Sequence, residues 1–390
     1  PLGVREQQAL GEGAPLAARL TVRYPIFQGP MTRVSDRAPF AQAVAEAGAV
    51  PFLALALMRG AEVEALLTET AQRLAGRTWG VGILGFVPAE LREEQLEVVR
   101  RIKPPVALIA GGRPAQAQPL QDLGIATFLH TPSPGLLDLF LKQGARRFVF
   151  EGMECGGHVG PRSSLVLWEQ QVARLLAHPD PSELEIVFAG GIHDGRSAAM
   201  VAALAAPLVE RGAAIGVLMG TAYLFTREAV AAGAIEAGFQ QTALACTETV
   251  LLETAPGHAT RCADTDYVRA FRAERERLQR EGVPAQAMWQ ALEELNLGRL
   301  RIAAKGVRRD GDALVRVDAD VQRREGMVML GQVAALRAGV TTVAQLHRDV
   351  VEGAGAQLAA AAGAAAARSD ARPADIAIVG MAAILPGAPD

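Results

Sequence analysis

The sequence has few cysteines and no long apolar run, and both shortages exclude classes of protein. Cys155, Cys246 and Cys262 are odd in number and widely spaced. We therefore expect no disulfide framework and no metal site, and a reduced, cytoplasmic setting is the simplest interpretation. Only the Ala-rich tract at 356–367 forms an extended apolar stretch, and it is too weakly hydrophobic to span a membrane. We expect no membrane association.

The chain also lacks a strong charge of either sign. Its formal net charge is -3, and basic clusters such as 272–280 and 323–324 are interleaved with or followed by glutamates. Nucleic-acid binding needs a concentrated basic patch, so we expect no nucleic-acid partner. These clusters are typical of solvated helix faces.

Short apolar runs that alternate with helix-length segments dominate the first part of the chain. Half the residues are hydrophobic but only 5% are aromatic, which is typical of an α/β protein with tight helix-on-sheet packing. Eight such units in succession predict a (β/α)₈ TIM barrel with a smaller helical insertion or cap domain, and a doubly wound sheet is the alternative. The eight expected strands are 25–28, 52–56, 78–84, 106–110, 125–130, 147–150, 185–189 and 215–219.

The alternation of short apolar runs and helix-length segments ends after the eighth unit, and this change sets the expected domain boundaries. The opening Pro1-Leu2-Gly3 has no initiator methionine, so we expect the chain to be cut from a longer one. Helices are predicted at 264–281, 284–295, 321–338 and 343–354. The expected organisation is an N-terminal extension (1–20), the barrel (21–232), a mainly helical cap (233–335), a helix returning to the barrel (336–362), a linker (363–374) and the beginning of a further domain (375–390).

One glycine-rich loop at 151–160 is the strongest functional signal. Gly156 and Gly157 let the backbone approach a flat ligand, and the loop leaves one imidazole, His158, projecting from a predicted strand end. Strand ends of parallel α/β proteins carry their chemistry. His158 is therefore the candidate catalytic residue, whereas the neighbouring Cys155 is interpreted as a packing residue and Glu154 as a structural carboxylate.

Two consecutive strand ends predict a phosphate site. Ala189-Gly190-Gly191-Ile192 and Met219-Gly220-Thr221 follow the seventh and eighth expected strands. In a (β/α)₈ barrel these loops are the preferred position for a phosphate, although ordinary close-packing turns would look similar. A ring joined to that phosphate by a short tail would lie over the barrel mouth, facing 28–31 and the His158 loop. His130 at the fifth strand end is a further candidate for facing the ring.

Together, the motifs at 25–31, 154–160, 189–192 and 220–221 resemble the FMN-binding signatures of a known superfamily. It comprises the nitronate monooxygenases (2-nitropropane dioxygenases) and the FMN-dependent enoyl-acyl-carrier-protein reductases. The resemblance covers about residues 20–355 and implies non-covalent FMN, with NADPH or NADH as co-substrate and His158 as the active-site imidazole. The cofactor-binding residues it implies are Gln28, Gly29, Pro30, Met31, Gly82, Gly156, Gly157, Gly190, Gly191, Gly220 and Thr221. Met327, Gly331 and Gln332 match a stretch that returns to the flavin in relatives.

Two departures from that family qualify the implied activity. Members with nitronate activity generally carry Asn in the third-strand motif where this chain has Gly82, and a polar or basic residue on the fourth strand where it has Leu108-Ile109-Ala110. The resemblance thus favours the reductase branch.

A second resemblance is carried by 376–382 and Pro386-Gly387, which are similar to the opening of the β-ketoacyl synthase domain of a modular polyketide synthase. It implies an enoyl reductase acting on chains bound to an acyl carrier protein, with a ketosynthase downstream on the same polypeptide. A homodimer is a further possibility. An oxygen-using, nitronate monooxygenase-like oxidase and a non-catalytic docking module are the alternatives.

Overall fold

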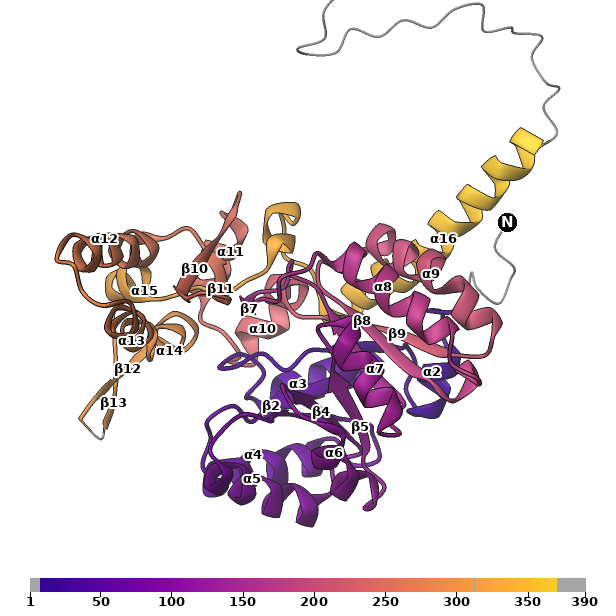
Figure 1. The fold of residues 1–390 in the computed structure, drawn as a ribbon, viewed down its shortest axis with the longest axis horizontal. Helices are drawn as coiled ribbons and strands as arrows, with labels where there is room; N and C mark the ends of the chain where they lie inside the picture. The colour runs from indigo at the N-terminus through magenta and orange to yellow at the C-terminus, as the bar shows by residue number, and fades with distance from the viewer. Residues whose placement is uncertain (1–7, 312, 370–390) are drawn as a thin grey trace, which may run out of the picture.

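Eight parallel strands form a closed barrel in the computed structural model, which describes residues 8–311 and 313–369 (Figure 1). Each strand is hydrogen-bonded to the next, and the last, β9, pairs with β1 through Ile26↔Val217 and its neighbours. The predicted TIM barrel is confirmed and the doubly wound alternative is wrong. The strands are β1 (Ile26–Gln28), β2 (Val50–Ala54), β3 (Gly80–Leu84), β4 (Val106–Ala110), β5 (Ala126–His130), β6 (Arg147–Glu151), β8 (Glu185–Ala189) and β9 (Ala214–Met219).

A layer of helices surrounds the barrel. Their starts follow ordinary capping chemistry: Ser133 accepts a hydrogen bond from Leu136 N (3.4 Å), and Asp194 accepts one from Ser197 N (2.8 Å). Seven helices follow their strands, and an eighth arrives only after the cap. The seven are α3 (Ala38–Glu46), α4 (Gly60–Arg73), α5 (Ala89–Ile102), α6 (Pro114–Gln121), α7 (Pro134–Lys142), α8 (Ser164–Leu176) and α9 (Gly195–Glu210).

The interior of the barrel is a packed core. Alternate residues of each strand point inward, and Phe27 lies 5.2 Å from Phe52 and 5.1 Å from Phe128 between ring centroids. The short helix α2 (Pro15–Arg19) plugs the N-terminal end with Leu16, which packs against Gly216. The core therefore closes the bottom of the barrel and leaves the opposite end for a ligand.

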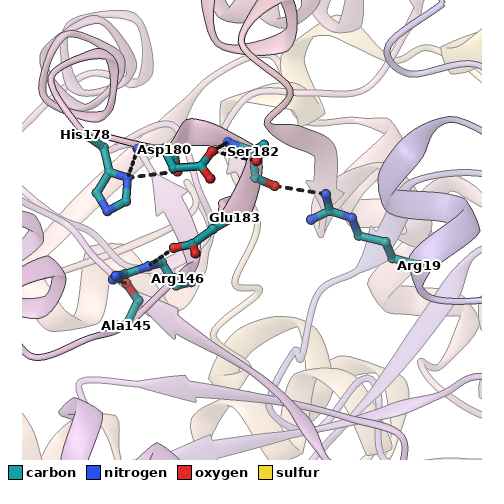
Figure 2. A network of polar contacts seen from close by, with 7 residues as sticks. All are labelled: Arg19, Ala145, Arg146, His178, Asp180, Ser182 and Glu183. Atoms are coloured by element: carbon teal, nitrogen blue, oxygen red, sulfur yellow. Dashed lines mark hydrogen bonds and ion pairs between the residues drawn. The ribbon is translucent and has the colours of Figure 1, made fainter.

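Polar contacts fasten the closed end. Figure 2 shows Arg19 of α2 donating to Ser182 O (3.0 Å) and Arg146 donating to Glu183 (3.0 Å). The nearly buried Glu185 accepts from Arg147 at 2.8 Å. These charged contacts at the N-terminal face serve stability, since the chemistry of a TIM barrel belongs to the other face.

The cap is inserted between the last barrel strand and the last barrel helix. The chain passes through η2 (Thr221–Phe225) and α10 (Arg227–Ala231) and then builds a body beside the barrel (Figure 1). It contains α11 (Ala237–Leu244), β10 (Thr249–Ala255), β11 (His258–Ala263), α12 (Asp266–Arg280), α13 (Ala285–Asn296), α14 (Arg299–Lys305), β12 (Val307–Asp310), β13 (Ala313–Arg316) and α15 (Ala319–Glu325).

The cap is less purely helical than expected. β10 and β11 form an antiparallel sheet with β7 (Gly157–His158), a strand contributed by the predicted His158 loop, while β12 and β13 form a separate hairpin. The single helix predicted at 321–338 is wrong. α15 ends at Glu325, an extended stretch follows, and η3 (Gln332–Leu336) is a short 3₁₀ turn. Gly326 allows the extended stretch to approach α14 closely, because a Cβ at this position would lie only 2.9 Å from Ala303 Cα.

The returning helix α16 (Val343–Ser369) completes the barrel's outer layer. It packs against α9, where a Cβ on Gly195 would lie 2.4 Å from the Gly353 carbonyl carbon. The helix continues into 363–374, which composition suggested as a linker; 370–374 and the ketosynthase-like segment 375–390 lie outside the described residues. Within the described part of the chain, no helix is both long and apolar enough to cross a bilayer.

Candidate active site

A cavity of about 240 Å³ lies at the C-terminal ends of the barrel strands. The loops after β1, β6, β8 and β9 line it from the barrel side, and Leu300, Met329, Leu330 and Val333 line it from the cap segment. Of the residues predicted from the sequence, the structure brings together Gly29, Pro30, Met31, Gly156, Gly157, His158, Gly190, Gly191, Gly220 and Thr221 around this cavity. We call it the main cavity.

Gln28 and Gly82 lie behind its wall. Gln28 is fully buried and its amide donates to Gly29 O. A Cβ on Gly82 would lie 2.2 Å from Pro30 Cβ, so this glycine makes room for Pro30 to pack on the third strand. Both residues therefore shape the Gly29–Met31 platform without lining the cavity themselves.

Glycine is required in the loops after β8 and β9. Gly190 and Gly191 have φ of +100° and +79°, and a Cβ on Gly190 would lie 2.4 Å from Ser164 Oγ. Thr221 Oγ1 accepts a hydrogen bond from Gly331 N (2.7 Å), which leaves the hydroxyl proton to donate to a ligand. A loop of backbone N–H groups with one hydroxyl donor suits a phosphate.

His158 reaches the main cavity from the cap sheet. It lies on β7 opposite Thr260 of β11, and the preceding Gly156 fits tightly because a Cβ there would lie 2.6 Å from the Leu330 carbonyl carbon. Partial burial, and then the nearby His258, lower the pKa of His158 below its ordinary value. The ring is therefore neutral at neutral pH, with one nitrogen donating and the other accepting.

A second acid–base pair lines the main cavity from the barrel. His130 ends β5 and Glu151 ends β6, and His130 Nε2 lies 3.5 Å from Glu151 Oε2. That nitrogen is buried and makes no hydrogen bond within residues 8–311 and 313–369. Burial raises the pKa of Glu151, although His130 and the Cys155 thiol oppose the rise. The sequence analysis named His130 as a candidate but gave Glu151 no role; its inward parity on β6 is the signal that could have identified it.

Cys155 and Glu154, which were expected to be a packing residue and a structural carboxylate, both line the main cavity. Burial, and then the charge of Glu151, raise the pKa of Cys155 well above its ordinary value, so the thiol stays protonated. Glu154 accepts hydrogen bonds from the backbone and hydroxyl of Ser164 (2.8 Å for the backbone), which anchors the loop to α8. Nothing in this contact leaves Glu154 free for proton transfer.

The segment after α15 seals the main cavity on the cap side. Gly331 bonds to Thr221, and Gln332 N donates to Glu154 O (2.9 Å). Met327 instead belongs to the cap core, and its neighbour Met329 reaches the cavity. Within the described residues no three His, Cys, Asp or Glu side chains are placed to hold a metal ion together.

These features fit a bound flavin mononucleotide. The glycine loops after β8 and β9 form a cradle that a Cβ at Gly190 would fill. Gly29 packs directly against Leu218, where a Cβ would come within 2.7 Å. Phosphate at the seventh and eighth strand ends is the usual arrangement of this barrel. The fold and site define a flavin-binding (β/α)₈ enzyme.

The chain belongs to the nitronate monooxygenase family, whose model matches residues 69–353. Members of this family are FMN-dependent oxidoreductases, so the predicted enzyme class is confirmed at that level.

Two curated relatives are each 28% identical to the chain. Both are named (3aS,4S,5R,7aS)-5-hydroxy-7a-methyl-1-oxo-octahydro-1H-indene-4-carboxyl-CoA dehydrogenase. The one from Rhodococcus jostii matches over 64% of this chain and 65% of its own length, and the one from Mycobacterium tuberculosis over 59% and 61%. The chain thus spans less than two thirds of the relatives that it matches.

Three solved structures share the fold. FabK from Thermotoga maritima has a TM-score of 0.71 at 23% identity, covering 90% of this chain and 98% of that one. Nitroalkane oxidase from Streptomyces ansochromogenes has a TM-score of 0.66 at 20% identity, covering 89% and 100%. The enoyl reductase domain of MlnA, from the macrolactin biosynthesis cluster of Bacillus amyloliquefaciens, has a TM-score of 0.64 at 14% identity, covering 90% and 98%. At these identities the likeness concerns the fold alone.

Proposed function

We propose that this chain is an FMN-dependent enoyl-thioester reductase, in which hydride from NADPH or NADH reaches the β-carbon of an α,β-unsaturated acyl thioester. The observation that carries the proposal is the composition of the main cavity. Its described lining contains no Lys, Arg or Asn, and its walls include Leu108, Val149, Leu218 and Leu300. A nitronate anion would be left without a cation there, whereas a neutral enoyl thioester is suited to apolar walls.

When bound, FMN would supply the hydride-transfer chemistry that links the nicotinamide to the β-carbon. The backbone of Gly190, Gly191 and Gly220 and the hydroxyl of Thr221 would hold its phosphate. An imidazole N–H of His158 would donate a hydrogen bond to the thioester carbonyl as negative charge develops on that oxygen. The resulting enolate takes one proton at the α-carbon, from the N–H of His158 or from a water molecule, and solvent then restores the proton of the imidazole.

Arginines next to the lining of the main cavity support a substrate whose thioester is carried on a phosphopantetheine arm. Thr32 and Leu300 line the cavity, and each is followed in the chain by an arginine, Arg33 and Arg301. Burial, and then the charges of Arg33 and Arg309, lower the pKa of Arg301. Among the described residues none of these three arginines is ion-paired, although Glu62 lies close enough to Arg301 to offset part of the repulsion. Such a concentration of positive charge suits the phosphate of that arm.

The carrier and its context remain part of the proposal. An acyl carrier protein would present the enoyl chain, and the resemblance of 376–382 to a ketosynthase opening supports an enzyme that works within a polyketide synthase. The names of the MlnA domain and of the carboxyl-CoA dehydrogenases support thioester chemistry of this kind.

An anaerobic stopped-flow experiment tests the function. NADPH or NADH is mixed with the FMN-loaded protein, bleaching of the flavin absorbance is followed, and crotonyl thioester is then added. We expect bleaching by one nicotinamide and recovery of the flavin band on addition of the thioester.

The other outcomes separate the alternatives. If the flavin band recovers only with oxygen and a nitronate, the nitronate monooxygenase-like oxidase is favoured over the reductase. A protein that takes up no FMN would support a non-catalytic docking module instead.

A further inference from the structure

A second cavity adjoins the main cavity. It has a volume of about 410 Å³ and lies between the loop that follows β4 and helix α7. Ala110 lines the main cavity and the next residue, Gly111, lines the second, so consecutive residues of the chain line the two cavities. We call the second cavity the side cavity.

The walls of the side cavity are largely apolar. Pro132, Leu136, Leu139 and Phe140 supply them, with Arg113 and Gln143 as the polar contributors. Leu136 and Leu139 are 37% and 46% exposed. Phe86, which is 70% exposed, packs at Gly111, where a Cβ would lie 2.6 Å from its ring. Large apolar side chains gathered around a hollow indicate a ligand rather than ordinary surface.

One side chain belongs to both cavities. His130 is the residue that the two described linings share, and its Nε2 is buried with no hydrogen bond from a described residue. Its ring is held toward Glu151 at 3.5 Å by a contact too long for a strong hydrogen bond. Rotation about its side-chain torsions would therefore break little and would connect the two spaces.

We propose that the side cavity binds the distal hydrocarbon part of the acyl chain, with His130 as the gate between this cavity and the reaction centre. This inference rests on the proposed function, since it takes the thioester end of the same substrate to lie in the main cavity. A hydrocarbon tail matches the apolar walls, and continuity through His130 places its far end there. The volume falls within the range of small-molecule sites.

Binding of acyl thioesters that cannot be reduced tests the side cavity directly. Butyryl and dodecanoyl N-acetylcysteamine thioesters would be titrated into the FMN-loaded protein by calorimetry. We expect dodecanoyl to bind at least about tenfold more tightly, because burial of roughly two methylene groups already gives that factor. Leu136→Trp should fill the cavity and remove this preference without weakening butyryl.

Leu123→Trp is the matched control. Leu123 has the same 37% exposure as Leu136 but lies outside both cavities, so its replacement should leave both affinities unchanged. Leu139→Trp on the same wall repeats the test if Leu136→Trp does not fold. His130→Ala should act in the opposite direction and raise the ratio of dodecanoyl to butyryl affinity.

The result separates this inference from the proposed function. Equal binding of the two thioesters by the native protein, or a Leu136→Trp protein that keeps its preference for dodecanoyl, would overturn the side-cavity proposal even if crotonyl thioester is reduced. Conversely, a dodecanoyl preference abolished by Leu136→Trp supports the side cavity even if no enoyl thioester is reduced.

Discussion

His158 and the His130–Glu151 pair line the same cavity and come from different parts of the fold. His158 comes from the cap sheet and the pair comes from the ends of β5 and β6. His158 could be identified from the sequence as a residue of this cavity because glycines isolate it in one loop. Glu151 was missed although its inward parity on β6 is visible in the sequence, because its partner His130 ends a different strand and only the closed barrel brings the two together.

Replacing His158 with Ala separates the two half-reactions. We expect enoyl thioester reduction to slow by roughly 10²–10⁴-fold, the usual contribution of a positioned acid–base or hydrogen-bonding group. Flavin reduction by NADPH should stay within a few-fold, since it needs no donor at the thioester carbonyl. Stopped-flow traces of each half-reaction measure both rates, and equal slowing of the two would refute this role.

At the scale of elements, α16 is fastened to the barrel through a buried histidine. His347 is fully buried; its Nδ1 donates to Ala47 O (2.9 Å), and its Nε2 accepts from the Tyr223 hydroxyl (2.7 Å). Burial lowers the pKa of His347 to about 4. The ring is therefore neutral, and protonation would remove the acceptor that Tyr223 needs.

This histidine makes stability sensitive to acid. Because the folded pKa lies below the unfolded value of about 6.5, its contribution is complete above that value and is lost as the pH falls to about 4. The difference corresponds to about 3 kcal/mol in the free energy of unfolding. Urea unfolding at a series of pH values should show this loss in the native protein and a much flatter profile in His347→Gln.

His178→Gln is the control for that measurement. His178 lies in the polar loop of Figure 2, where its ring contacts Asp180, and its replacement should leave the acid dependence intact. If His347→Gln keeps the full acid loss, another group is responsible.

The elements also show what local patterns can and cannot predict. All eight barrel strands were identifiable, because each is a short buried run ended by a glycine, proline or polar turn. The helix predicted at 321–338 failed because Met327, Val328 and Leu330 are buried in an extended stretch, in which the half-buried Met329 is bridged to Cys262 of β11. That pairing joins segments far apart in the sequence, and no local periodicity records it.

At the scale of the whole molecule, the cap and the barrel together bring Arg301 close to Arg33 and Arg309. Lys305 of α14 bonds to Asp36 of the loop after β1 (2.6 Å) and so holds Arg301 near Arg33. Nothing in the sequence indicated a role for Arg33, Arg301 or Arg309. These arginines come together only when the cap docks on the barrel, and the sequence of residues 233–335 does not by itself predict how it docks.

If the arginines around Arg301 bind the phosphate of the substrate, removing one of their charges should weaken the binding of phosphate-bearing substrates selectively. Arg301→Gln should raise the KM of a CoA-linked enoyl thioester by roughly tenfold, as expected for one lost charge-assisted hydrogen bond. The KM of the N-acetylcysteamine thioester, which has no phosphate, should not change. Steady-state kinetics at two salt concentrations would measure both, and the CoA effect should shrink at high salt.

Arg308→Gln provides the comparison, because Arg308 is exposed on β12 next to Arg309 but does not perturb Arg301. Equal increases in KM for both thioesters in Arg301→Gln would indicate a general disturbance of the cavity and would contradict phosphate recognition.

The late position of α16 in the chain has a consequence for the order of folding. The groove of α9 around Gly195 is covered by α16, whose residues are made only after the entire cap. During synthesis the barrel strands can pair while this side stays open, and closing it requires a loop of more than a hundred residues to bring its ends together. We therefore expect docking of α16, with burial of Leu346, Val350 and Leu358, to be the last and slowest folding step.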